Sequence, residues 1–198
     1  MKFDNDIRVI VPHMAMSAGT MIACCAKEII MGKHSSLGPI DPQLNGIPAY
    51  DIVQMYLDAK RALASDKNTF LYWKLLLDRY PPPFIYTAIS AIRLSSALVK
   101  DWLGSCMFDK TRDEDKESIN RIAKALNEHD DSKTHDRHFD IEQCKNFGLK
   151  ITDLEADQKL QDAILSLHHA YIFTIDNTNT VKIIENQRGK ALVSMTKS

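Results

Sequence analysis

The pattern of apolar and polar segments along the chain predicts a few short strands among more numerous helices. Residues 7–12, IRVIVP, are rich in β-branched side chains and end at a proline, which is typical of a buried strand. Residues 18–31 are dominated by Ala, Met and Ile and predict a mostly buried helix. Residues 32–48 concentrate Gly, Pro, Ser and Asn, and therefore predict a long shaped loop.

The middle of the chain has the periodicity of helices. Residues 49–64 and 68–79 predict two amphipathic helices, and the triple proline at 81–83 ends the second one. Residues 84–103 predict a third and more apolar helix. After these helices, the sequence predicts a charged connector at 108–117, a helix at 115–128 and a polar loop at 128–140. A short helix ending at Gly148 and a strand follow. The C-terminal part predicts a helix at 155–170 and two strands within 171–186.

These elements predict one α/β domain over residues 1–198, with 155–198 as a helix and short strands at its C-terminal end. The 25 basic and 26 acidic side chains nearly cancel, so nucleic acid is not expected as the main partner. The four cysteines form no C-x-x-C pair, and the start MKFDNDIRV has no apolar core of a signal peptide. No uncharged apolar run reaches the length of a membrane span. We therefore expect a cytoplasmic chain without a span, a cofactor or a metal.

One short stretch carries candidate chemistry. In PHMAMSAGTMIACC, residues 12–25, Ser17 stands between small residues where the predicted strand gives way to the predicted helix. A helix start leaves backbone N–H groups without partners, and these groups attract negative charge. A serine hydroxyl held there can act as a nucleophile beside a ready oxyanion site, as in the nucleophile elbow of other hydrolases. The alternative is that Ser17 only caps the helix, since serine is a favoured N-cap residue.

Two further segments point to a known family. Residues 15–43, AMSAGTMIACCAKEIIMGKHSSLGPIDPQ, resemble the nucleophile segment of the Clp-fold serine peptidases, and most closely the serine dehydrogenase proteinase family. This family is related to signal peptide peptidase A and to the proteolytic subunit of the Clp protease. Residues 133–151, KTHDRHFDIEQCKNFGLKI, resemble its late catalytic segment more weakly. The resemblance implies a Clp/crotonase-like α/β fold, hydrolysis of peptide bonds through an acyl-enzyme, and assembly into homo-oligomers.

The resemblance also implies roles for individual residues. Ser17 matches the nucleophile, and the backbone amide of Ala18 matches one oxyanion-hole donor. Asp41 stands in PIDP, where the Clp subunit places its catalytic histidine, and is a weak base because the ordinary pKa of an aspartate is near 4. Asp136 aligns most readily with the catalytic aspartate.

The general base is left open by the sequence. His135 is the preferred candidate because it precedes Asp136 in THD, and His138 is the second. Lysine is the base in signal peptide peptidase A, which makes Lys33 and Lys60 positions to test. The same loop could instead hold solvated or capping histidines, and its spacing matches neither H-E-x-x-H nor a zinc finger.

The resemblance breaks upstream of Ser17. Clp-fold peptidases complete the oxyanion hole with a glycine pair that precedes the nucleophile, and this chain has no Gly-Gly. Only 16 residues precede Ser17, so the fold is expected to lack its first strands. Two alternatives to a peptidase follow: a non-catalytic Clp-fold module for assembly or interaction, and an acyl-CoA enzyme, since crotonases share the broader fold.

Overall fold

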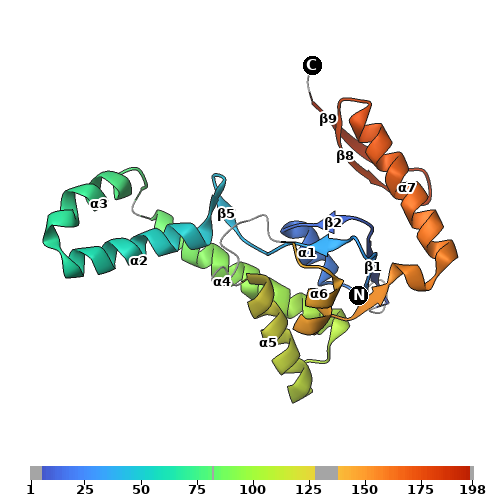
Figure 1. Cartoon of the computed structure of the whole chain (residues 1–198), viewed down its shortest axis with the longest axis horizontal. Helices are drawn as coiled ribbons and strands as arrows, with labels where there is room; N and C mark the ends of the chain where they lie inside the picture. Colours follow the sequence, from blue (N-terminus) through green and yellow to red (C-terminus); the bar gives the residue numbers. More distant parts are fainter. Residues whose placement is uncertain (1–5, 82, 128–137, 197–198) are drawn as a thin grey trace. The chain divides into compact units, whose positions relative to one another are not determined.

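The computed structural model describes residues 6–81, 83–127 and 138–196, which belong to two compact units, Met1–Thr152 and Asp153–Ser198. The first unit is helix-rich α/β, as predicted (Figure 1). A single domain over the whole chain stays a prediction. The elements of the first unit are β1 (Arg8–Val11), β2 (Met14–Ala15), α1 (Ala18–Ala23), β3 (Glu28–Met31), β4 (Ser36–Leu37), β5 (Gln43–Leu44), β6 (Ile47–Pro48), α2 (Ala49–Ser65), the 3₁₀ turn η1 (Lys67–Thr69), α3 (Phe70–Leu77), α4 (Phe84–Trp102), the π-helical turn η2 (Leu103–Met107), α5 (Asp113–Asn127), α6 (Ile141–Phe147) and β7 (Ile151–Asp153).

The first unit contains a three-stranded sheet of order β1-β3-β7. β1 and β3 are parallel, with Val9 opposite Ile29 and Val11 opposite Met31. Parallel neighbours need a crossover connection, which here contains α1. On the other edge of β3, the N–H of Ile29 donates to the carbonyl of Lys150 over 2.9 Å.

The helix predicted at 18–31 is wrong in its second half. The helical segment ends at Ala23, and Glu28–Met31 is the central strand of the sheet. Ile29, Ile30 and Met31 are all buried. An apolar run buried on both faces has no alternating pattern, so its periodicity cannot be distinguished from that of a buried helix.

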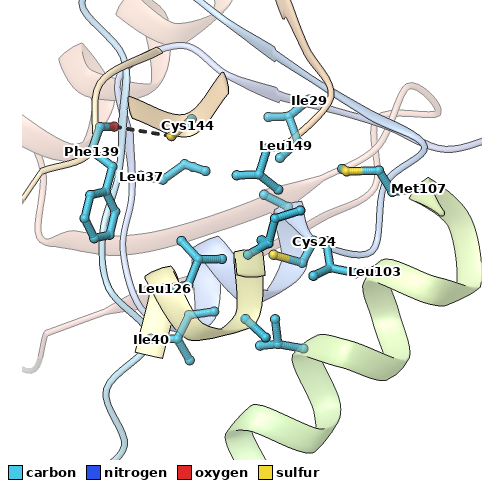
Figure 2. Packing of buried hydrophobic residues seen from close by; sticks show 14 of the residues in the cluster. Cys24, Ile29, Leu37, Ile40, Leu103, Met107, Leu126, Phe139, Cys144 and Leu149 are labelled. Carbon is cyan, nitrogen blue, oxygen red and sulfur yellow. Dashed lines mark hydrogen bonds between the residues drawn. The ribbon is translucent and has the colours of Figure 1, made fainter. Parts of the chain in front are cut away.

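The main hydrophobic core joins this sheet to the helices that follow it (Figure 2). Cys24 from the end of α1 packs with Leu103 of η2 and Leu126 of α5, and all three are 0% exposed. Cys144 of α6 also lies in this core, and its thiol is 3.6 Å from the carbonyl oxygen of Phe139. Burial raises the pKa of the Cys24 and Cys144 thiols to about 12, so both behave as small core residues rather than as nucleophiles.

Helices α2 and α4 form a second packed layer. Ala49, Ile52 and Ala88 are buried between them, with Tyr56 and Ile92 packed alongside. These helices match the predictions at 49–64 and 84–103, and η1 with α3 matches 68–79. In Figure 1, α3 lies at the end of α2 remote from the β1–β3 sheet. We call the α2, η1, α3 and α4 segment the arm.

Helix α6 has the boundaries that its sequence predicts. The Asp140 side chain accepts from the N–H of Gln143 over 2.8 Å, and the Gln143 side chain accepts from the N–H of Asp140 over 3.1 Å. This reciprocal pair is a capping box. Gly148 ends the helix with φ 104°, a conformation that side chains disfavour, and β7 follows.

The second unit contains the 3₁₀ turn η3 (Leu154–Ala156), α7 (Gln158–Asp176) and a hairpin of β8 (Thr180–Glu185) and β9 (Ala191–Met195). The prediction of two strands within 171–186 is therefore wrong for the first strand, because residues 171–176 belong to α7. The second predicted strand is β8, which pairs instead with β9 beyond the predicted segment. Each added helical residue gains one backbone hydrogen bond, which outweighs a weak local preference for strand. The helix ends at Asn177, whose N–H and side-chain amide both donate to the carbonyl of Phe173. None of the helices in the described ranges has the length and apolar character needed to cross a membrane.

Candidate active site

Ser17 lies in a strained turn between a strand and a helix. β2 ends at Ala15, α1 begins at Ala18, and Ser17 has φ 48° and ψ −110°. Among the non-glycine residues that the structure describes, only Ser17 and Asn45 have positive φ. A side chain held in such a region costs about 1–3 kcal/mol, and such strain clusters at functional sites.

The hydroxyl of Ser17 is not used to stabilise the helix. Ser17 occupies the N-cap position of α1, but its side chain makes no capping hydrogen bond to the described residues, and both Ser17 and Ala18 are exposed. Ser17 therefore stands exposed directly before the first helical residue, Ala18. A nucleophile with a backbone oxyanion donor needs a serine at such a helix start.

A buried hydroxyl fixes the turn from below. Thr20 is 0% exposed, and its Oγ1 lies 2.8 Å from the carbonyl oxygens of both Ala15 and Gly38. The N–H of Gly38 also donates to the Ala15 carbonyl over 2.8 Å. The Ser17 turn and the loop after β4 are therefore connected by three short contacts to backbone oxygens.

Gly38 permits the close approach that these contacts need. A Cβ added at Gly38 would lie 2.3 Å from Sδ and 3.3 Å from Cα of Met16, the residue before Ser17. The first clash could be relieved by moving the Met16 side chain, whereas the second involves the backbone of the turn itself. The glycine of GPIDP therefore has a local steric role beneath Ser17.

A pocket of about 230 Å³ opens beside Ser17. Its lining is mostly apolar and comes from α1, from the loop after β4 and from α4. The lining residues are Ser17, Met21, Ile40, Asp41, Pro42, Ala91, Leu94, Ser95 and Leu98. Asp41 is the titratable member of this set and is 6% exposed.

The loop that carries Asp41 is fixed on both sides. The N–H of Ile40 donates to the carbonyl of Leu126 in α5 over 2.7 Å, and the carbonyl of Pro42 accepts from the N–H of Ala49 at the start of α2 over 2.8 Å. The tertiary structure thus brings Asp41 to the same pocket as Ser17, 24 positions away in the chain.

The other predicted site residues are not brought to this pocket by the described structure. His135 and Asp136 lie outside the described residues. His138 is exposed, and its Nδ1 lies 3.1 Å from Oγ of Ser36. Lys33 and Lys60 are exposed and do not line the pocket.

The wall supplied by α4 was missed by sequence analysis. Ala91, Leu94, Ser95 and Leu98 recur at helical spacing, so the sequence shows a stripe. It does not show which element the stripe packs against. Ser95 is buried, and its hydroxyl lies 3.3 Å from Oδ1 of Asn127 on α5.

Residues 1–77 match the family described as ClpP-like SDH-type serine proteinases. This match confirms the family predicted from the sequence. The matched segment includes Ser17, Ala18 and Asp41, whereas His135, Asp136 and His138 lie beyond it. The family description supports the coarse class of serine peptidase.

Two relatives from Methanocaldococcus jannaschii extend the similarity along the chain. The uncharacterized protein MJ0137 is 30% identical over 181 residues, covering 90% of this chain and 53% of the relative. The uncharacterized protein MJ1495 is 29% identical over 143 residues, covering 72% of this chain and 41% of the relative. The chain thus spans about half the length of the curated relatives it matches. No solved structure matches it significantly.

Proposed function

We propose that this chain carries the nucleophile of a serine-type endopeptidase, with Ser17 as the attacking residue. The observation that carries the proposal is the strained turn at φ 48° and ψ −110°, at an exposed serine whose side chain does not cap α1. Strain at a serine between a strand and a helix is the geometry of a nucleophile elbow. Membership of a ClpP-like serine proteinase family supports the same chemistry.

The proposed reaction proceeds through an acyl-enzyme. The Ser17 oxygen attacks the carbonyl carbon of a peptide bond while its proton passes to a general base. The resulting oxyanion accepts a hydrogen bond from the Ala18 N–H. The C–N bond then breaks, the leaving amine takes up the proton, and water hydrolyses the Ser17 ester with the base acting again.

His135 remains our preferred base, and Asp136 its partner. His138, Lys33 and Lys60 are the alternatives for the base. For Asp41 we propose an orienting role, because it is buried and lines the same pocket as Ser17. We propose that a second oxyanion donor comes from a Gly-Gly segment of the kind that related peptidases carry upstream of the nucleophile.

The pocket indicates what would lie next to Ser17. Its apolar lining and volume of about 230 Å³ suit an apolar side chain of a peptide substrate better than a charged one. We therefore propose a peptide or protein substrate with an apolar residue beside the scissile bond. Assembly into a homo-oligomer is also proposed, as the family resemblance implies.

A fluorophosphonate probe tests the nucleophile directly. Because the probe reacts covalently with an activated serine, we expect one labelled residue, identified as Ser17 by mass spectrometry. Labelling should be lost in Ser17→Ala and retained in Ser36→Ala, the matched control for the exposed serine beside His138.

Labelling of the control variant and of the wild type decides whether Ser17 is the nucleophile. Labelling that persists in Ser17→Ala, or that disappears in Ser36→Ala, would contradict the assignment of Ser17. A folded chain that never labels would instead favour the non-catalytic assembly module. Peptide hydrolysis dependent on Ser17 would exclude that module and the acyl-CoA enzyme.

A further inference from the structure

An unusual concentration of aromatic side chains occurs at one end of the arm. The chain has seven Phe, six Tyr and two Trp residues, and six of these fifteen lie within residues 67–86. We call residues 67–86 the aromatic tip. It comprises η1, α3, the proline turn and the start of α4. Its aromatic residues are Phe70, Tyr72, Trp73, Tyr80, Phe84 and Tyr86.

Helix α3 exposes its apolar residues rather than burying them. None of its eight residues is buried. Leu71 is 65% exposed, Tyr72 61% and Leu75 64%, while Tyr86 at the start of α4 is 72% exposed. The principal contacts of α3 are with η1 and α2 (Figure 1). Its sequence therefore has the composition of a core helix at a solvent-exposed position.

The exposed apolar residues of α3 are Phe70, Leu71, Tyr72 and Leu75, whereas Trp73, Leu76 and Leu77 are partly buried. Residues 70–73, FLYW, cover one full turn of 3.6 residues, and all four are aromatic or aliphatic. Lys74 is the single charged residue of α3. A helix that is apolar on all sides is normally surrounded by apolar material, whereas an amphipathic helix docks by one face. At 3.6 residues per turn, the exposed apolar residues of α3 span roughly 200° of the helix circumference, wider than the single stripe of an amphipathic helix, which favours immersion over docking on a flat protein surface.

The charge around the aromatic tip supplies a second and independent observation. Residues 59–93 contain six basic and two acidic residues, a net charge of +4, whereas the whole chain has −1. Local basic charge next to exposed Trp, Phe and Leu is the combination that binds anionic lipid surfaces. Tyr and Trp rings prefer the boundary between headgroups and acyl chains, and long Lys and Arg side chains extend towards the headgroups.

The length of α3 limits how it can lie in a membrane. Eight residues form a helix about 12 Å long, well short of the roughly 30 Å hydrocarbon core of a bilayer. Helix α3 can therefore lie within the interface but cannot cross it. The Tyr80 and Phe84 rings stack with centroids 5.1 Å apart, which connects the segment after α3 to the start of α4. Little ordering would then be needed on binding.

We propose that the aromatic tip inserts into the interface of a membrane containing anionic lipids. The apolar residues of α3 enter the boundary region, and basic residues of the arm contact the headgroups. The inference does not depend on the chemistry of Ser17. If both hold, the membrane-bound arm also contributes α4 to the wall of the Ser17 pocket.

Vesicle co-sedimentation of the full chain tests the proposal. We expect binding to vesicles of phosphatidylcholine with phosphatidylglycerol, at least tenfold weaker binding to phosphatidylcholine alone, and loss of affinity as salt rises. In a Trp102→Phe background, Trp73 becomes the sole tryptophan, and its emission should shift to shorter wavelength when anionic vesicles are added.

Matched double variants separate the tip from other exposed apolar surface. Leu71→Glu with Leu75→Glu should lower binding at least tenfold. Leu167→Glu with Phe173→Glu should leave it unchanged, because these residues are also exposed but lie on α7. Circular dichroism checks that both variants stay folded.

Three results would overturn the proposal. They are a wild type that does not bind anionic vesicles, equal loss in the two double variants, and no change in Trp73 emission on binding. A tip variant that converts a soluble oligomer to monomer without affecting vesicle binding would assign the surface to contacts between copies instead.

A separate lysine-to-glutamine change, Lys67→Gln, should weaken binding to the mixed vesicles only.

Discussion

The Ser17 turn and the aromatic tip use opposite means to present a functional surface. At the Ser17 turn, Thr20 and Leu37 are 0% exposed and the Thr20 hydroxyl is hydrogen-bonded, whereas Ser17 itself is exposed. At the tip the backbone forms an ordinary helix, while Leu71 and Leu75 stay exposed. The backbone at Ser17 is strained and is held by the buried residues beneath it. The aromatic tip is not strained, but it leaves apolar side chains exposed.

This contrast indicates where substitutions should be costly. Changes beneath Ser17 should lower the free energy of unfolding and also disturb the turn, because packing and hydrogen bonds are shared there. Changes at the tip should alter binding to other surfaces with little effect on folding. Two substitution pairs test this difference, and a third pair tests the strain at Ser17.

The largest effect is expected from removing apolar volume. Leu37→Ala, at 0% exposure, should lower the free energy of unfolding by about 2–5 kcal/mol because a cavity forms in the core. Leu71→Ala, at 65% exposure, should change it by no more than about 0.5 kcal/mol. Urea denaturation followed by circular dichroism measures both, and similar losses would break the comparison.

A smaller effect is expected from one buried hydroxyl. Thr20→Val keeps the shape of the side chain but removes its contacts to the Ala15 and Gly38 carbonyls, and should cost about 1–3 kcal/mol. Fluorophosphonate labelling at Ser17 should also slow.

The tip supplies the control for this change. The hydroxyl of Thr69 donates to the carbonyl of Asp66 over 2.7 Å at an exposed position. Thr69→Val should therefore cost less than about 0.5 kcal/mol, because water can satisfy the freed carbonyl. A Thr20→Val protein with unchanged stability and labelling would show that this hydroxyl does not support the turn.

The smallest expected effect is an increase in the free energy of unfolding. Ser17→Gly should raise the free energy of unfolding by about 1 kcal/mol, since glycine relieves the strain at φ 48° but loses more chain entropy on folding. Labelling should be abolished. Asn45→Gly, at φ 54°, is the control and should gain less, because asparagine tolerates positive φ. A destabilised Ser17→Gly would mean that Ser17 makes stabilising contacts instead.

Part of the fold could be predicted because its signals are local. The capping box at Asp140, the stop at Gly148 and the boundaries of α2 and α4 depend on residues within a few positions of each other. The strand Glu28–Met31 could not be distinguished from helix, because its neighbours β1 and β7 lie far away in sequence. The extension of α7 through residues 171–176 was missed because strand-favouring side chains occur there in a continuing helix.

The candidate site could also be predicted only in part. Ser17 between small residues, and Asp41 in PIDP, could be selected from the sequence. Their approach to one pocket, and the wall of Leu94 and Leu98, could not. His135 and Asp136, chosen by resemblance, stay predictions.

The sequence by itself showed the resemblance of residues 1–77 to a serine proteinase family, the serine and the small residues that allow a sharp turn, since these depend on side-chain identity and nearest neighbours. The tertiary structure decided that Ser17 is strained and exposed, that Asp41 is buried in the same pocket, and that no residue of α3 is buried. The physical reason is that strain, burial and exposure depend on contacts between segments distant in the chain, and a local pattern does not specify which segments meet.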